Sequence, residues 1–261
     1  MPAPNEITTS QLNRLIGTPD CPAIVDICID PDFADDPYLI PGSFRHPHTD
    51  IPGLIPRLEG RSAIIACQKG LKLSQGLTAW LRSEGMRAEY LKGGIFAWRN
   101  DPATQRIPAA ALPKTNLWVT RHRPKIDRIA CPWLIRRFVD REARFLFVSP
   151  GEVAEVAERF DATPFDVDGA PFAHRGEACT FDAMLDAFAL HSDPLDRMAR
   201  VIRGADTDRH DLAPQAAGLL ALSVGLSRQY KDDTAQLNAG LTFYDALYRW
   251  ARDGFDEGHN A

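Results

Sequence analysis

Residues 64–74 read Ile-Ile-Ala-Cys-Gln-Lys-Gly-Leu-Lys-Leu-Ser, and this stretch decides how the first half of the chain folds. The apolar residues before the cysteine predict a buried strand, whereas Leu73, Leu77 and Trp80 have the spacing of a helix. Cys67 therefore falls on a loop between a strand and a helix. The backbone N–H groups of such a loop, with the N-terminus of the following helix, favour an anion.

This environment lowers the pKa of a thiol and makes the thiolate a nucleophile. Two lysines add positive charge for an anionic donor such as thiosulfate, and a glycine permits a tight backbone path. The predicted donor site consists of Gln68, Lys69, Gly70, Leu71 and Lys72. The alternative is that Cys67 is a small apolar residue ending a core strand, because buried cysteine is common.

The rest of the first half alternates between strand and helix patterns. Residues 30–57 are rich in proline, aspartate and glycine and are expected to be mostly loop. Strands alternating with helices indicate parallel pairing in an α/β layer fold. The other expected elements are a helix at 9–16 and strands at 23–27, 62–66 and 88–91.

Three further segments match the motifs of a known domain family: Val25-Asp26, Ile40–Ser43 and Leu91–Trp98. Together with the Cys67–Lys72 loop, they make residues 8–100 resemble a single rhodanese domain. The resemblance implies a doubly wound parallel sheet. It also implies that the cysteine takes sulfane sulfur from thiosulfate or a persulfide, holds it as a persulfide, and passes it to a thiol acceptor.

Two positions depart from relatives on this fold. Many rhodanese-type proteins have arginine where this chain has Lys72, and lysine lacks the planar fork that grips an oxyanion. Related phosphatases have a loop one residue longer that ends in arginine. Leu73 stands at that position here, which disfavours phosphoester chemistry.

The second half follows a proline-containing linker. We expect a first domain at 8–105, a linker at 106–116 and a second domain at 117–255. The second domain is expected to be mainly α with a small sheet. Its predicted strands are 117–120 and 144–148, and its predicted helices are 132–139, 151–160, 181–190, 194–203, 214–230 and 233–252.

Five segments of this half carry a second resemblance: Trp118–Arg121, Asp127–Phe138, His174–Asp182, Gly204–Asp206 and Tyr244–Tyr248. Because of them, residues 117–252 resemble the C-terminal domain of the chromate-resistance (ChrB-type) family. That family includes chromate-responsive regulators whose N-terminal domain binds DNA. A rhodanese-like domain occupies that place here, so a link to chromate or another oxyanion is expected by analogy, and a transcription factor is not.

Two groups of residues in the second half are candidate sites. Arg121, Arg123 and Arg128 lie in a basic run that could hold an oxyanion such as chromate; the alternative is a solvated basic face. His174, Glu177 and Asp206 offer the ligand types of a divalent metal site. The alternative for these three is that they are capping and surface residues.

Composition limits the remaining function classes. The 261 residues are 44% hydrophobic and carry a net charge of -5, so the chain lacks the overall positive charge that favours binding to nucleic acid. No leader pattern and no membrane-length apolar run occurs, and the five cysteines contain no CxxC pair. We therefore expect a cytoplasmic protein with reduced thiols and no membrane partner.

The hypothesis is a rhodanese-type sulfurtransferase that forms a persulfide on Cys67, requires no cofactor, and is linked to chromate or oxyanion resistance. One alternative is a non-catalytic chromate or redox sensor. The other is a metal-dependent protein centred on His174 and nearby carboxylates.

Overall fold

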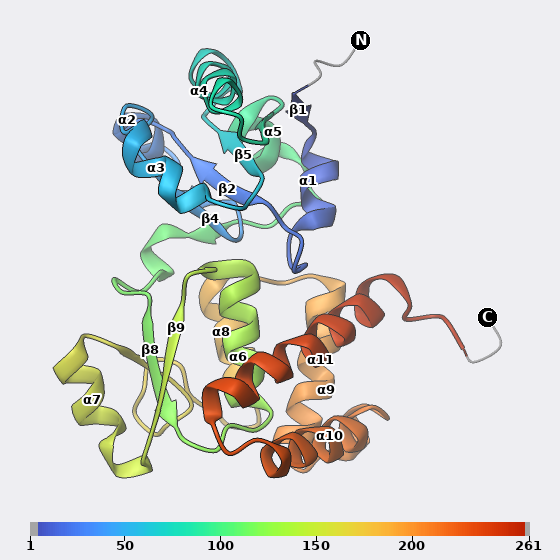
Figure 1. The fold of residues 1–261 in the computed structure, drawn as a ribbon. Coiled ribbons are helices and arrows are strands. Elements are labelled where there is room, and N and C mark those ends of the chain that lie inside the picture. Colours follow the sequence, from blue (N-terminus) through green and yellow to red (C-terminus); the bar gives the residue numbers. More distant parts are fainter. Residues whose placement is uncertain (1–4, 259–261) are drawn as a thin grey trace. The chain divides into compact units, whose positions relative to one another are not determined.

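The structure is a computed structural model that describes residues 5–258, and its ribbon is shown in Figure 1. The chain divides into two compact units. The first unit comprises the residues up to 112 together with 137–140, and the second comprises 113–136 and the residues from 141 onward. Part of the expected linker is structured within the first unit, since strand β7 (Ile107–Pro108) pairs with β3 (Tyr38–Leu39).

The first unit contains a five-stranded sheet in which all neighbouring strands are parallel. The strand order is β1-β6-β5-β2-β4. The elements besides β3 and β7 are β1 (Glu6–Ile7), α1 (Thr9–Leu15), β2 (Ala23–Asp26), α2 (Asp30–Ala34), β4 (Ser43–Arg45), α3 (Ile51–Leu58), β5 (Ala63–Ala66), α4 (Lys72–Ser83), β6 (Ala88–Leu91), α5 (Gly94–Asn100) and a 3-10 turn at Ala109–Ala111.

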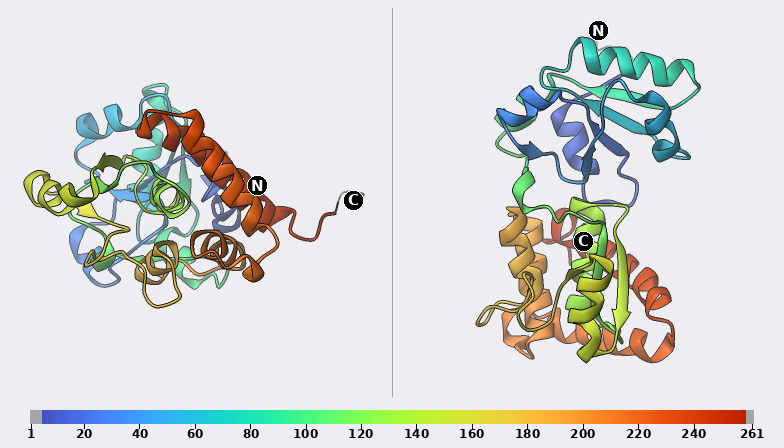
Figure 2. Two further views of the ribbon diagram at one scale, coloured as in Figure 1. Left: turned by 90° about the horizontal axis from the view of Figure 1, so that it is seen from below. Right: turned by 90° about the vertical axis from the view of Figure 1, so that its left-hand side faces the viewer.

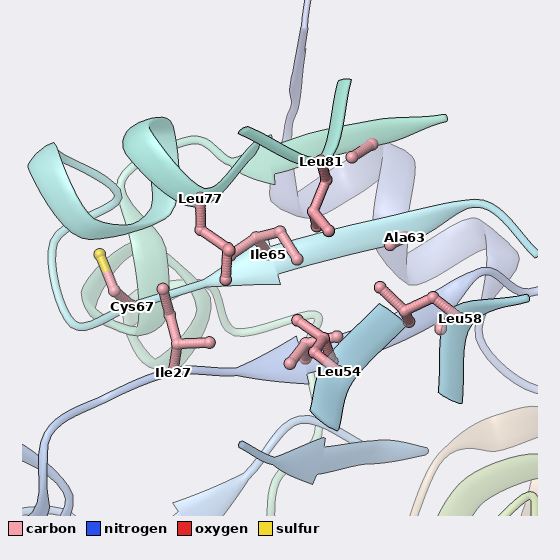
Figure 3. Close-up of a cluster of buried hydrophobic side chains, with 11 residues drawn as sticks. Ile27, Leu54, Leu58, Ala63, Ile65, Cys67, Leu77 and Leu81 are labelled. Carbon is pink, nitrogen blue, oxygen red and sulfur yellow. The ribbon is translucent and has the colours of Figure 1, made fainter. Parts of the chain in front are cut away.

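Helices cover both faces of this sheet, and its central strands are therefore buried on both sides. Alternate residues of β2 and β5, such as Val25 and Ile65, pack with Leu54 of α3 and Leu77 of α4 (Figure 3). In the right-hand view of Figure 2, α4 and α1 lie on opposite sides of the strands. The predicted doubly wound parallel sheet is confirmed.

The expectation that 30–57 is mostly loop was wrong, because the residues that suggested loops begin helices. Pro31 and Pro52 stand in the first turns of α2 and α3, where a missing N–H costs nothing. The Asp50 side chain caps α3 by accepting a hydrogen bond from the Gly53 N–H. Strand β4 also lies in this segment and forms one edge of the sheet.

The second unit is mainly helical and has a three-stranded parallel sheet of order β10-β8-β9, as expected for its fold class. Its elements are β8 (Leu117–Arg121), α6 (Asp127–Leu134), β9 (Arg144–Val148), a 3-10 turn (Pro150–Glu152), α7 (Val153–Phe160), β10 (Thr163–Pro164), α8 (Thr180–Phe188), α9 (Asp193–Asp206), a 3-10 turn (His210–Leu212), α10 (Ala216–Gln229) and α11 (Asp233–Asp253). A π-helical turn (Ile135–Val139) follows α6, and its residues from 137 onward are grouped with the first unit.

The two faces of the small sheet pack against different partners. Val119 and its neighbours on one face contact α7, whereas Trp118 on the other face contacts Phe165 and Phe172. Helix α7 lies on one side of β8 and β9 in Figure 1, and the remaining helices lie on the other side. The helical layer is thus built on the face that carries the aromatic residues.

Helix α6 begins five residues earlier than the sequence pattern predicted. Pro132 suggested a helix start, but it lies inside α6, whose first residue is Asp127. The first turns of α6 are nearly all buried, so tertiary packing outweighs the hydrogen bond that the proline removes. Cys131 is consequently in the middle of the helix, and burial raises its pKa well above the usual range.

Over residues 5–258, no helix combines the length and the apolar character that crossing a membrane requires.

Candidate functional site

Cys67 directly follows β5, so it lies at the carboxyl edge of the parallel sheet, where α/β folds place ligands. Its side chain is 5% exposed, and its sulfur points toward the first turns of α4 (Figure 3). The thiol donates to the Oγ of Ser74 at 3.2 Å, and that hydroxyl donates to the Leu71 carbonyl at 3.2 Å. Because a hydroxyl rotates, Ser74 could also donate to a thiolate at this position.

Two glycines hold the loop that follows Cys67 against the start of α5. Gly70 and Gly94 have φ angles of 66° and 60°, a region that favours glycine. A Cβ on Gly94 would overlap the Cys67 carbonyl oxygen and the Gly70 nitrogen. The same carbonyl accepts a hydrogen bond from the Ile95 N–H at 3.0 Å. The loop from Cys67 to Lys72 is therefore fixed by close backbone contact.

The loop itself leaves its backbone donors available. Within the described part of the chain, no group accepts a hydrogen bond from the N–H groups of residues 68–72. Lys69 and Lys72 are exposed beside them, and the loop leads into the N-terminus of the 12-residue helix α4. Free N–H groups, a helix N-terminus and two cations together suit an anionic ligand.

Cys28 is a second thiol of the first unit but has a different environment. It lines a cavity of about 240 Å³ that Gln68 and Arg99 also line. Burial raises the pKa of the Cys28 thiol strongly, and the neighbouring Asp26 carboxylate raises it further. Cys28 is therefore held as a thiol, which is a poor nucleophile.

The second unit gathers charged side chains from distant parts of the chain at one place. Asp127 begins α6, His174 lies in the loop before α8, and Asp206 ends α9. The His174 Nε2 atom is 3.1 Å from Asp206 Oδ2 and 3.5 Å from Asp127 Oδ2. One donor atom of each of these residues lies within 4.8 Å of the others, so the three could hold a metal ion.

A fourth charged group, Asp166, links this cluster to two arginines. Its carboxylate is 3.0 Å from Arg121 Nη2, 3.2 Å from Arg128 Nε and 3.4 Å from His174 Nε2. It also accepts a hydrogen bond from the Thr180 hydroxyl at 2.9 Å. Asp166 thus connects the basic run to the cluster and anchors the start of α8.

The structure separates some of the candidate residues that the sequence grouped. Arg123 turns away from Arg121 and Arg128 and donates to the Tyr230 carbonyl and to Ser227. Glu177 is exposed and pairs with Arg209 at 3.3 Å, so the third carboxylate beside His174 and Asp206 is Asp127 instead.

Asp127 is held at the cluster by its own backbone position. The preceding residue, Ile126, has a φ of 42°, which is unusual for a β-branched residue. Hydrogen bonds fix it there, since its N–H donates to Ser223 and its carbonyl accepts from Tyr244. The Asp127 Oδ2 atom accepts the Thr180 N–H at 2.6 Å and so caps α8.

The close carboxylates shift the pKa values of the cluster upward. The pKa of Asp206 is raised to about 7, first by burial and then by the charges of Asp127 and Asp166. Contact with Asp127 raises the pKa of His174 to about 9. Burial also raises the pKa of Asp127. The cluster therefore favours a proton or another cation among its carboxylates.

Replacing Asp166 by alanine should destabilise the second unit by about 2 kcal/mol, because its hydrogen bond with Thr180 and its ion pair with Arg128 are lost. The ion pair between Arg121 and Asp166 adds little to this loss, because Arg121 is half-exposed and solvent screens the pair. Urea unfolding measures the change. The exposed Asp168→Ala variant lines the same cavity and serves as control; an equal effect in both variants would contradict this role.

Comparisons with known proteins bear mainly on the second unit. The family model described as ChrB, C-terminal domain, matches residues 118–251, just over half of the chain. The protein ChrB of Cupriavidus metallidurans is 36% identical over 132 residues, which are 50% of this chain and 39% of the relative. The match thus spans well under half of that relative's length.

Solved structures similar to this chain include a rhodanese-like domain protein from Staphylococcus aureus. It is 27% identical, with a TM-score of 0.33, and the match covers 39% of this chain and 96% of that one. Another is a thiosulfate sulfurtransferase from Pseudomonas aeruginosa. It is 20% identical with a TM-score of 0.33, and the match covers 40% of this chain and 19% of that one.

Proposed function

Because this chain belongs to the family that the ChrB C-terminal domain defines, we propose that it acts in resistance to chromate or a similar oxyanion, with a sulfurtransferase site at Cys67. The family membership supports the link to oxyanions. The first unit carries the proposed chemistry. Its buried thiol, at the carboxyl edge of a parallel sheet and beside free N–H groups, is the observation on which the sulfurtransferase proposal rests.

The proposed reaction has two displacement steps. The Cys67 thiolate attacks the outer sulfur of thiosulfate, an S–S bond forms on the cysteine, and the S–S bond of thiosulfate breaks as its electron pair leaves with sulfite. An acceptor thiolate then attacks the outer sulfur of the persulfide, and Cys67 leaves as thiolate. The acceptor carries away the sulfur as its own persulfide, so both steps balance without an oxidant.

The residues around Cys67 have separate tasks in this proposal. The N–H groups of residues 68–72 hold the negative charge of the donor and of the persulfide. Lys69 and Lys72 attract the anionic donor. The Ser74 hydroxyl, which accepts from the Cys67 thiol in the structure, would rotate to donate to the thiolate. Lys72 acts as a point charge, so it orients an oxyanion less strongly than the planar fork of an arginine would.

Mass spectrometry of the full chain after thiosulfate treatment tests the proposal. We expect the peptide that contains Cys67 to gain the mass of one sulfur atom, and a thiol acceptor to remove it. Peptides that contain Cys28 should stay unmodified, because burial and Asp26 keep that thiol protonated. Sulfur on Cys28 but not on Cys67 would refute the assignment of the nucleophile.

A further inference from the structure

We propose that Asp127, His174 and Asp206 bind one divalent first-row metal ion in the second unit, at a site separate from the Cys67 chemistry. The three residues come from α6, the loop before α8, and the end of α9. Their donor atoms already lie within 4.8 Å of one another. The fold therefore brings together ligands that are far apart in the sequence.

The distances from His174 to the two carboxylates are close to those between ligands of a shared ion. Two ligand atoms that are each about 2.1 Å from a metal, at octahedral or tetrahedral angles, are about 3.0–3.4 Å apart. The His174 Nε2 atom lies 3.1 Å from Asp206 Oδ2 and 3.5 Å from Asp127 Oδ2. Small side-chain movements would therefore complete a coordination sphere.

A buried atom without a partner gives independent support. Asp127 is 1% exposed, yet its Oδ1 accepts no hydrogen bond from any group in residues 5–258. A buried carboxylate oxygen without a partner is costly, so such an atom calls for an explanation. A cation bound by the Asp127 carboxylate would compensate this oxygen.

The two carboxylates also favour a cation between them. Arg121 and Arg128 pair with Asp166, and this leaves the carboxylates of Asp127 and Asp206 beside His174. A cation between these two carboxylates relieves the repulsion of like charges in a largely buried place.

The cluster is open to solvent on one side. A cavity of about 610 Å³ is lined by His174, Asp166 and Arg121, among other residues. The His174 side chain is 42% exposed, whereas the Asp127 side chain is 1% exposed. An ion could therefore enter from this side and keep water ligands there.

The donor set selects the class of metal. Carboxylate oxygens suit Mn²⁺ and Mg²⁺, whereas an imidazole nitrogen suits first-row transition metals. Two carboxylates with one imidazole therefore favour Mn²⁺ or a similar ion over Mg²⁺ or Ca²⁺. No cysteine is needed as a ligand: Cys131 and Cys179 are fully buried, and burial raises the pKa of both.

The test uses the full chain, treated with chelator and then titrated with Mn²⁺ by calorimetry. We expect one ion per chain, and an affinity at least about tenfold lower in Asp206→Asn and in His174→Gln. Glu177→Gln is the matched control and should bind like the wild type, because Glu177 pairs with Arg209 at the surface. No binding by the wild type, or equal affinity in all three variants, would overturn the proposal.

Pulsed electron paramagnetic resonance on bound Mn²⁺ keeps the test decisive if a variant is unstable. The wild-type spectrum should show coupling to an imidazole nitrogen, and this coupling should disappear in His174→Gln. Near-UV circular dichroism verifies that each variant is folded. Mn²⁺ bound by the wild type without nitrogen coupling would exclude His174 as a ligand and refute the site as proposed.

Discussion

Replacing Cys67 by serine will lower the rate of sulfur transfer from thiosulfate to a thiol by at least about a thousandfold, as expected when a covalent nucleophile is removed. The substitution exchanges one atom at a buried position, so the fold should be retained. A serine hydroxyl is a far weaker nucleophile at neutral pH and forms no persulfide. Release of sulfite, measured with wild type and variant at equal concentration, gives the two rates.

Cys28→Ser is the matched control for this experiment. Cys28 lies in the same unit and lines the cavity that Gln68 also lines, but burial and Asp26 raise its pKa. We therefore expect Cys28→Ser to keep the wild-type rate within about twofold. Transfer that persists in Cys67→Ser and disappears in Cys28→Ser would move the chemistry to the second thiol and reject the proposed mechanism.

The position of Cys67 in the first unit could be predicted from the sequence because the parts of this candidate site are contiguous. The strand that ends at Ala66, the loop with Cys67 and the helix that starts at Lys72 follow one another directly. Local patterns therefore place the thiol at the carboxyl edge of the sheet. The short helices α2 and α3 were missed, since their prolines and Asp50 have the same composition as a loop.

The cluster in the second unit could be predicted only in part. His174 and Asp206 stood out as metal-ligand types, but Glu177 was nearer in sequence than the carboxylate that the fold supplies. Asp127 was missed because Pro132 suggested a later helix start. Asp127 itself was the available signal for the true start of α6, because an aspartate is favoured in the first turn of a helix.

Nothing in the sequence indicated that Asp166 would lie in this cluster. It lies in a loop after β10 with a φ of 54°, and its partners Arg121 and Arg128 come from other elements. Only the packing of the small sheet against the helices brings these groups together. The basic run in the sequence therefore suggested an anion site, whereas in the fold Arg121 and Arg128 both pair with a buried carboxylate.

Replacing Gly94 by alanine will destabilise the first unit by about 3 kcal/mol or more, which is large for a single added methyl group. Two effects add. The φ of 60° costs an alanine about 1 kcal/mol. The new Cβ would also overlap the Cys67 carbonyl and the Gly70 nitrogen, which are backbone atoms of the Cys67–Lys72 loop and cannot rotate away as a side chain could. Thermal unfolding followed by circular dichroism measures the loss.

Gly76→Ala is the matched control, because Gly76 lies on the exposed side of α4 with no atom within 4 Å of an added Cβ among the described residues. Alanine there should stabilise α4 by about 0.5–1 kcal/mol, since glycine is a poor helix former. If Gly94→Ala unfolded at the wild-type temperature, the loop would be free to move. The close contact between α5 and Cys67 would then not be what fixes the thiol. If Gly94→Ala is less stable and also transfers sulfur more slowly while still folded, that contact positions the nucleophile as well as supporting the fold.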